Sequence, residues 1–235
     1  MAAPFVGVSA SPVVVAVRVL CGGYLFVVAC HVLLVISEAV RLRRFLSRCV
    51  PANGRLTQLV TRIATQSGLT HVPAVVVSEE IFGPMATGLL KTRIVIPAEM
   101  PDQLTERQLE FVIGHECSHL RNHDLWWSVL IGIVRIGLWP HPLVWRLPAT
   151  HRLACDLRCD AAAAGQDSSD YGTMLAQMAL TISAKPQPRM SLAFLTRSEV
   201  LHRICRVQSG INDDHLTSRS SIDSHCNRCC NRHAN

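Results

Sequence analysis

A long apolar run occupies the N-terminal part of the chain. From Val13 to Ile36 the sequence reads VVVAVRVLCGGYLFVVACHVLLVI, and Arg18 is its single charged residue. A helix of about 20 apolar residues crosses a hydrocarbon core about 30 Å thick, so this run is long enough to span a membrane. The pattern predicts an N-terminal transmembrane helix within residues 1–40.

Positive charges follow the run rather than precede it. A cleaved signal peptide, the main alternative, carries its positive charge before a shorter apolar region. The arginines that follow the run are Arg41, Arg43, Arg44 and Arg48. Basic residues beside a span stay in the cytoplasm, so we expect the chain after this helix to be cytoplasmic.

Helical and alternating patterns come next. Leu56 to Ser67 has the apolar spacing of an amphipathic helix, whereas Val72 to Ser78 and Lys91 to Pro97 predict strands. Glycine and proline at residues 83–88 mark a turn or an edge strand between them. Residues 83–97 would then offer an edge on which an extended peptide adds backbone hydrogen bonds.

A capping signal opens the following helix. Thr105 and Gln108 stand three residues apart just before an apolar run, which is the capping-box pattern of a helix N-terminus. We expect this helix to continue to about Asn122. His123 and Asp124 are then expected to end the helix, and Asp124 could also contact the functional site.

A second apolar stretch runs from Leu125 to Leu147 and contains Arg135, two prolines and Arg146. Its part without charge or proline is shorter than a usual membrane span. The stretch is compatible with a kinked membrane helix, an interfacial hairpin or a helix buried in the core. Further helices are predicted at Ala154–Gly165, Tyr171–Ser183 and Glu199–Gln208.

These patterns divide the chain into three parts. Residues 1–40 carry the membrane helix. Residues 41–209 form the main domain, in which residues 125–147 are an apolar segment that can insert into a membrane. Residues 210–235 form a polar tail, for which disorder is expected. Cys226 and Cys229 in the tail have metal-ligand spacing, but no second cysteine pair precedes them in a folded context.

Composition restricts the classes of function. Of the 235 residues, 49% are hydrophobic and 17% charged, and this apolar fraction excludes a disordered chain. A net charge of only +6 gives little support to nucleic-acid binding, and the mean hydropathy of +0.25 indicates a membrane protein. Most of the ten cysteines are expected to be reduced thiols rather than disulfides, because the chain after the membrane helix is expected to be cytoplasmic.

The capped helix contains the pattern H-E-x-x-H at residues 115–119. His115 and His119 are four residues apart, so both imidazoles face one side and can bind one zinc ion. Glu116 is placed to take a proton from a zinc-activated water and to pass it to the leaving amine. The bare pattern also recurs by chance in unrelated chains, but its place in a capped, apolar helix favours a metalloprotease.

Two carboxylates on a later helix extend the candidate site. Asp156 and Asp160 are four residues apart and face one side of the helix predicted from Ala154. One of them can bind zinc, while the other can orient a ligand histidine through its second ring nitrogen. The alternative is a solvated acidic edge that pairs with Arg152 or Arg158. The apolar residues around both carboxylates favour the buried, functional arrangement.

Three motifs together resemble a known protein family. They are GHECSHLRNHD at residues 114–124, HPLVW at residues 141–145 and DLRCDAAA at residues 156–163. Over about residues 15–207 the chain is similar to the integral-membrane zinc metallopeptidases of the BlaR/MecR beta-lactam sensors. The core is also similar to the HtpX-type and CAAX-prenyl membrane proteases. The resemblance implies an α+β fold that is mostly α and gluzincin-like, with a small β-sheet.

The resemblance also implies roles within the site. His115, His119 and Asp156 would bind Zn²⁺, Glu116 would be the catalytic base, and Asp160 would support a ligand histidine. The third ligand of the family is normally glutamate, and Asp156 is one methylene shorter.

A further candidate lies nearer the C-terminus. Arg203 precedes Ile204 where HtpX-like proteases have an Arg–Ile pair, and a cation there would stabilise the oxyanion of the tetrahedral intermediate. A surface arginine on a short helix fits equally well. Tyr171 and His202 are weaker alternatives for this role.

The expected function is therefore a zinc metalloendopeptidase of the bacterial cell membrane, with its active site facing the cytoplasm. Its expected partners are membrane lipid and a protein or peptide substrate, such as a transcriptional repressor cleaved in signal transduction. No direct contact with nucleic acid is expected. The alternatives are an HtpX-like quality-control protease and a degenerate zinc-binding receptor module that does not hydrolyse peptides.

Overall fold

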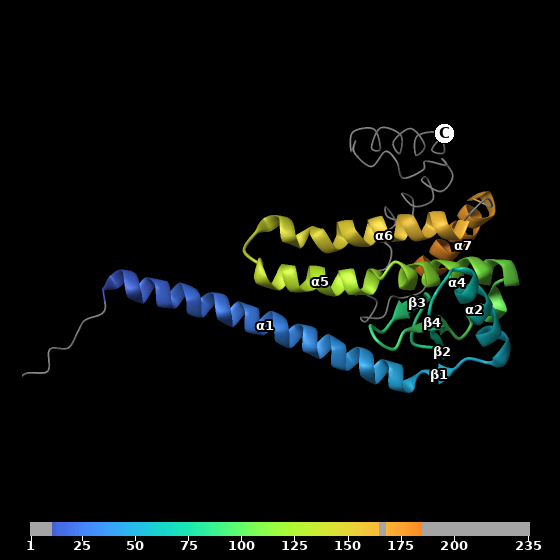
Figure 1. The fold of residues 1–235 in the computed structure, drawn as a ribbon, viewed down its shortest axis with the longest axis horizontal. Coiled ribbons are helices and arrows are strands. Elements are labelled where there is room, and N and C mark those ends of the chain that lie inside the picture. Colours follow the sequence, from blue (N-terminus) through green and yellow to red (C-terminus); the bar gives the residue numbers. More distant parts are fainter. Residues whose placement is uncertain (1–10, 165–167, 185–235) are drawn as a thin grey trace, which may run out of the picture.

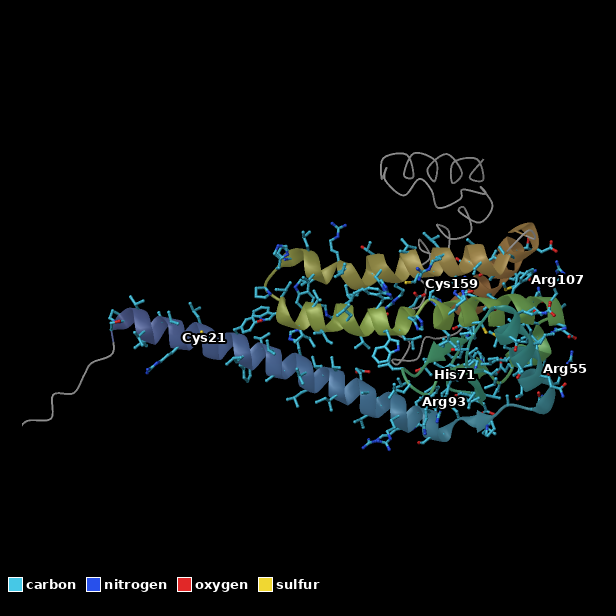
Figure 2. The ribbon with its side chains drawn as sticks, in the orientation of Figure 1. Cys21, Arg55, His71, Arg93, Arg107 and Cys159 are labelled. Atoms are coloured by element: carbon cyan, nitrogen blue, oxygen red, sulfur yellow. The ribbon has the colours of Figure 1, made fainter. Side chains whose placement is uncertain are left out.

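The computed structural model describes residues 11–164 and 168–184 of the chain. Its first element, α1 (Pro12–Arg48), extends away from the rest of the molecule (Figure 1). Most of its side chains, such as Cys21 in Figure 2, project into the surroundings. Among the described residues, α1 alone is long and apolar enough to cross a membrane. The predicted span lies within α1, which continues beyond residue 40 because no helix breaker occurs before Pro51.

A four-stranded sheet follows α1 and α2 (Gly54–Gln66) in the chain. Its strands are β1 (Val50–Pro51), β2 (Ala74–Ser78), β3 (Met85–Thr87) and β4 (Arg93–Pro97), arranged in the order β1-β2-β4-β3. β2 and β4 pair in parallel, whereas β1 and β3 pair antiparallel at the two edges. The two predicted strands are confirmed and begin two residues later than expected, and the 83–88 region contains the edge strand β3.

The turn between β3 and β4 requires a glycine. Gly88 has φ +88°, and a Cβ at this position would lie 2.2 Å from the carbonyl oxygen of Lys91. β1 was not predicted, because it has two residues and one of them is Pro51. A proline lacks the N–H that a central strand needs, but an edge strand tolerates it.

One hydrophobic core lies between the sheet, α2 and α4 (Glu106–Arg121), with the short helix α3 (Met100–Gln103) beside it. The helices predicted at residues 56–67 and 105–122 are confirmed to within two residues. Thr105 and Gln108 form both hydrogen bonds of the predicted capping box. The most deeply buried apolar side chains of this core include Val60, Ala64, Ile94, Ile96, Ile113 and Cys117.

Helices also pack on the other side of α4. α5 (Asp124–Gly137) and α6 (Leu147–Ala164) form a helical hairpin with the 3-10 turn η1 (Pro142–Trp145) at its tip, and α7 (Ser168–Ala184) packs against α4 and α6 (Figure 1). α6 begins at Leu147 rather than at Ala154, because Pro148 occupies the first turn, where its missing N–H breaks no helical bond. The helix predicted at residues 199–208 and the tail at 210–235 lie outside the described residues.

The second apolar stretch is not a helix buried in the core, which removes one of the three alternatives. It forms α5 and η1, and most of its large apolar side chains are open to the surroundings, although Val144 is buried. Trp127 is 54% exposed and Ile133 is 60% exposed. The fold as a whole is mostly helical with a small mixed sheet, as the family resemblance implies.

Ile94 and Leu90 provide a test of the core. Ile94 is fully buried in β4, whereas Leu90, four residues earlier, is 88% exposed. We expect Ile94→Ala to lower the free energy of unfolding by about 2–5 kcal/mol, because it leaves a cavity. Leu90→Ala should change it by less than about 0.5 kcal/mol. Thermal unfolding of both variants in one detergent measures the difference, and equal midpoints would contradict this core.

Candidate metal centre

Two histidines on α4 point to one place. His115 and His119 lie one helical turn apart, and their Nε2 atoms are 3.1 Å from each other. Their rings are nearly perpendicular, at 81°, with centroids 4.8 Å apart. The helix therefore presents two imidazole nitrogens side by side, as the four-residue spacing predicts.

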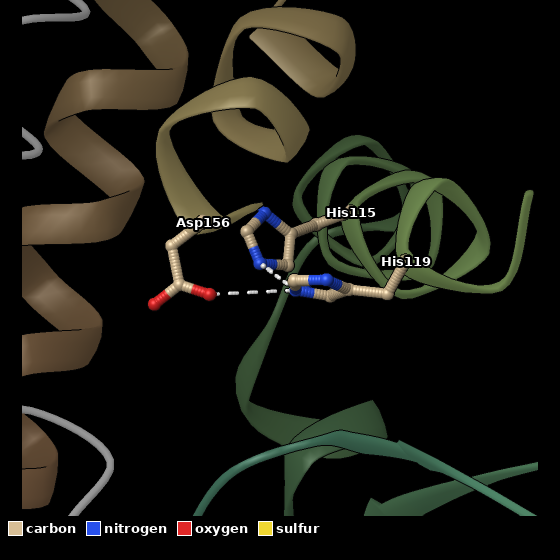
Figure 3. A group of neighbouring side chains, drawn as sticks. All are labelled: His115, His119 and Asp156. Carbon is tan, nitrogen blue, oxygen red and sulfur yellow. Dashed lines mark hydrogen bonds and ion pairs between the residues drawn. The ribbon is translucent and has the colours of Figure 1, made fainter. Parts of the chain in front are cut away.

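A carboxylate from α6 reaches the same place. Asp156 Oδ1 lies 3.6 Å from His119 Nε2, and one ligand atom from each of the three side chains lies within 4.8 Å of the other two (Figure 3). Helices α4 and α6 can approach closely here because Gly114 faces Ala163, so only a small side chain stands between them. The three donors come from two helices that are about 40 residues apart in sequence.

The donor set fits zinc. Zinc takes imidazole nitrogen and carboxylate oxygen at about 2.0–2.2 Å in tetrahedral geometry, so neighbouring donors lie about 3.4 Å apart. The separations of 3.1 Å and 3.6 Å bracket this value. Three protein donors leave the fourth tetrahedral position for water or substrate. Asp156 therefore reaches the site despite its shorter side chain, because α6 packs close to α4.

The second nitrogen of His115 is held by buried groups. Its Nδ1 lies 3.0 Å from Asp160 Oδ1, and Asp160 is fully buried. The Tyr171 hydroxyl donates to the same oxygen at 2.6 Å and lies 3.2 Å from His115 Nδ1. An Nδ1–H directed at a carboxylate leaves Nε2 as the free donor for a metal. The structure thus separates the two carboxylates: Asp156 faces the Nε2 atoms and Asp160 faces Nδ1.

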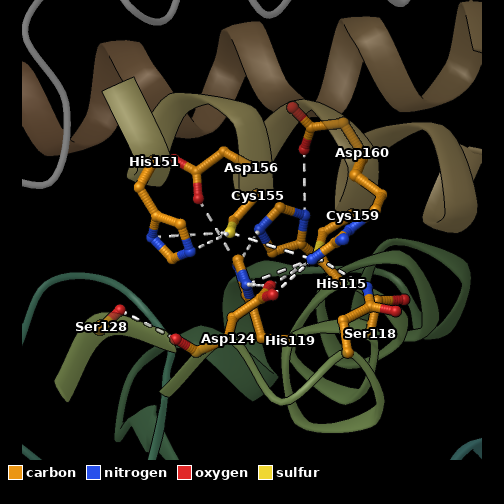
Figure 4. Close-up of polar contacts among 12 residues, drawn as sticks. His115, Ser118, His119, Asp124, Ser128, His151, Cys155, Asp156, Cys159 and Asp160 are labelled. Atoms are coloured by element: carbon orange, nitrogen blue, oxygen red, sulfur yellow. Dashed lines mark hydrogen bonds and ion pairs between the residues drawn. The ribbon is translucent and has the colours of Figure 1, made fainter. Parts of the chain in front are cut away.

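A different carboxylate holds His119. Its Nδ1 lies 2.8 Å from Asp124 Oδ2 (Figure 4). Asp124 also accepts a hydrogen bond from Arg158 of α6. The Cys159 thiol lies 3.4 Å from the same nitrogen. Burial lowers the pKa of His119, but the hydrogen bonds to Asp124 and Cys159 outweigh burial and raise it to about 11.

The chain bends sharply between His119 and Asp124. On a straight helix, a residue five positions later lies about 140° away around the axis and cannot reach the histidine. His123 has φ +57°, in the left-handed region, and lies between α4 and α5 as the N-cap residue of α5. The bend returns Asp124 to His119. The sequence alone did not decide whether Asp124 contacts the site, because no residue pattern predicts that His123 adopts the left-handed conformation.

The other candidates lie in different surroundings. Glu116 follows His115 on α4 and is 6% exposed. Arg158, considered above as a partner of the two aspartates on its own helix, pairs instead with Asp124. Tyr171 is 2% exposed and supports His115 from the buried side, which does not suit an oxyanion donor. Arg203, His202 and the cysteines at 226 and 229 lie outside the described residues.

The sequence of the chain is similar to sequences of known proteins. The family model described as BlaR1 peptidase M56 matches residues 8–207. The methicillin resistance mecR1 proteins of Staphylococcus aureus strain Mu50 and of Staphylococcus epidermidis are each 30% identical to the chain over 83 residues. That segment is 35% of this chain and 14% of each relative, so the chain spans a small part of the length of these relatives. Because the family model covers most of the sequence, the chain belongs to the BlaR1 peptidase M56 family.

Proposed function

We propose that the chain is a membrane-bound zinc metalloendopeptidase. The observation that carries the proposal is the convergence of His115, His119 and Asp156 at zinc-like separations beside a buried Glu116. Membership of a peptidase family supports the same activity. A bound zinc ion would polarise the scissile carbonyl and lower the pKa of the attacking water.

Side chains of this protein would carry out proton transfer and would hold the two histidines in place. Glu116 takes a proton from the attacking water and passes it to the leaving amine. Asp160 and Tyr171 hold the ring of His115 in one orientation, and Asp124 does the same for His119. Fixed rings keep the donor geometry constant while charge develops on the substrate.

An extended peptide fits the neighbouring sheet edge. β3 is one of the two edge strands of the sheet and contacts α4, the helix that carries both histidines (Figure 1). A peptide that adds to an open strand edge gains backbone hydrogen bonds without regard to its side chains. This placement supports a peptide or protein substrate that lies along α4.

We further propose regulatory cleavage of a cytoplasmic protein, such as a transcriptional repressor. The arginines after the apolar part of α1 support a cytoplasmic site, and the mecR1 relatives are named for methicillin resistance. Arg203 is the proposed oxyanion donor. Asp156, in place of the usual glutamate, favours one other candidate function: a zinc-binding receptor module that does not hydrolyse peptides.

The role of Glu116 as catalytic base is tested by comparing its alanine variant with the alanine variant of another glutamate on α4. We expect Glu116→Ala to retain zinc, because Glu116 is not a ligand, and to lower the rate of casein cleavage by about 100-fold or more. Glu110→Ala is the control, since Glu110 pairs with Arg62 away from the three donors. Zinc content and cleavage are measured on detergent-purified protein. Loss of zinc in Glu116→Ala, or unchanged cleavage, would refute the role of base; a parent that binds zinc without cleaving would establish the receptor module.

Measurements of zinc affinity distinguish the roles of Asp156 and Asp160, the two aspartates of α6 that lie at the site. Asp156→Ala should lose most bound zinc, and Asp160→Asn should weaken binding by about 10–100-fold, because it supports a ligand. Asp156→Glu should retain or improve binding. Asp170→Asn, at an exposed carboxylate of α7, is the control. Titration against a competing chelator ranks the variants, and parental affinity in Asp156→Ala would remove this residue from the ligand set.

The orientation of α1 has its own test. A reporter fused after Asn53 should be active on the cytoplasmic side, because the arginine cluster that follows the apolar run stays inside. A second fusion before Val13 serves as the opposite control. A signal from outside the membrane at Asn53 would reverse the proposed topology and place the metal centre outside the cell.

A further inference from the structure

The helical hairpin of α5, η1 and the first half of α6 has an unusual composition. All four tryptophans of the chain lie between residues 126 and 145, at the base and at the tip of the hairpin. No acidic residue occurs from residue 125 to residue 155, where the charged residues are Arg135, Arg146 and Arg152. Tryptophan concentrates at membrane–water interfaces, and arginine is attracted to anionic lipid headgroups.

The outer face of α5 is apolar and uncovered. Its exposed large side chains are Trp126, Trp127, Val129, Leu130, Ile133 and Val134. The one basic side chain of α5, Arg135 in its last turn, is turned away from this face, because its guanidinium lies over the Trp145 ring at 5.7 Å. Soluble proteins rarely expose a continuous apolar surface of this kind.

The tip of the hairpin contacts the middle of α1. Tyr24 stacks on Trp139 with ring centroids 6.4 Å apart, and its hydroxyl donates to the carbonyl of Gly137. His31 and Trp145 lie 6.0 Å apart. Figure 1 shows the hairpin extending in the same direction as α1 from the sheet and core. The apolar face of the hairpin is therefore continuous with the apolar surface of the candidate span.

The length of α5 matches the length of α1 between its contact with the hairpin and the end of its apolar run. Tyr24 precedes Ile36, the end of the apolar run, by 12 residues or about 18 Å of helix. α5 has 14 residues and rises about 20 Å from Asp124 to Gly137. With α1 across a bilayer, the tip lies near the bilayer centre and Asp124 lies level with the cytoplasmic end of the apolar run. α5 is too short to cross the hydrocarbon core of about 30 Å.

We propose that this hairpin is a re-entrant membrane element that inserts its tip beside α1 and contacts lipid acyl chains through the outer face of α5. Trp126 and Trp127 lie near the cytoplasmic interface, and Trp139 and Trp145 lie deeper. Arg146 and Arg152 follow the tip in the chain, and arginine has a side chain long enough to reach toward headgroups from a position below them. The metal centre, whose Asp124 begins α5, then stands at the membrane surface.

Tryptophan fluorescence tests the proposal directly, because every tryptophan of the chain reports on the hairpin. The full chain is placed in vesicles of phosphatidylcholine and phosphatidylglycerol, with bromine on the acyl chains either near the headgroups or near the chain ends. We expect brominated lipid to quench about half or more of the fluorescence, since exposed indoles contact the acyl chains. Fluorescence quenching needs neither bound zinc nor peptide hydrolysis. Its result therefore does not depend on whether the chain is a zinc peptidase.

Two double variants measure the depth. Trp126→Phe with Trp127→Phe leaves the tip pair, which we expect deep bromine to quench more than shallow bromine. Trp139→Phe with Trp145→Phe leaves the base pair, for which the order should be reversed. Parental zinc content in each variant shows that the site is intact.

Three outcomes overturn the proposal. Quenching of both pairs by shallow bromine alone indicates a hairpin that does not place its tip at the bilayer centre. Absence of quenching in the unmodified chain indicates that protein, for instance a second copy of this chain, covers α5. Deeper quenching at the base than at the tip indicates insertion from the opposite end.

Discussion

The convergence of α4 and α6, which brings Asp156 Oδ1 to 3.6 Å from His119 Nε2, is the constraint on which the rest of the structure depends. Two imidazoles from one helix and one carboxylate from another must come within the reach of a single ion, and Asp156 offers a short side chain for this purpose. Small residues at the crossing allow the helices to approach. The sheet and α2 hold α4 from one side, and α5 and α7 supply the groups that orient its histidines.

Local signals in the sequence predicted the elements that depend on local chemistry. The Thr105–Gln108 capping box located α4, the β-branched runs located β2 and β4, and the four-residue spacings placed His115 beside His119. The fold class followed from a family resemblance and is confirmed. Each of these features is encoded within a few consecutive residues, which is the range over which sequence patterns carry structural information.

Contacts between distant residues were harder to predict. The return of Asp124 to His119 depends on a left-handed His123, and the Tyr171 hydroxyl reaches Asp160 only because α7 packs against α6. The pairing of Arg158 with Asp124, rather than with an aspartate of its own helix, is set by the packing of α5 against α6. Such contacts have no period or spacing in the sequence. They arise when tertiary packing decides between several equally plausible partners.

The chain from Tyr171 through Asp160 to His115 also sets an order of events during synthesis. His115 leaves the ribosome first, the third donor follows some 40 residues later, and the hydroxyl that fixes Asp160 comes later still. A nascent chain that stops before α6 has the two histidines but lacks Asp156, the carboxylate that faces their Nε2 atoms. The three candidate donors therefore come together only after α6 has been translated and has packed against α4, and His115 gains the support of Tyr171 only after α7 has docked.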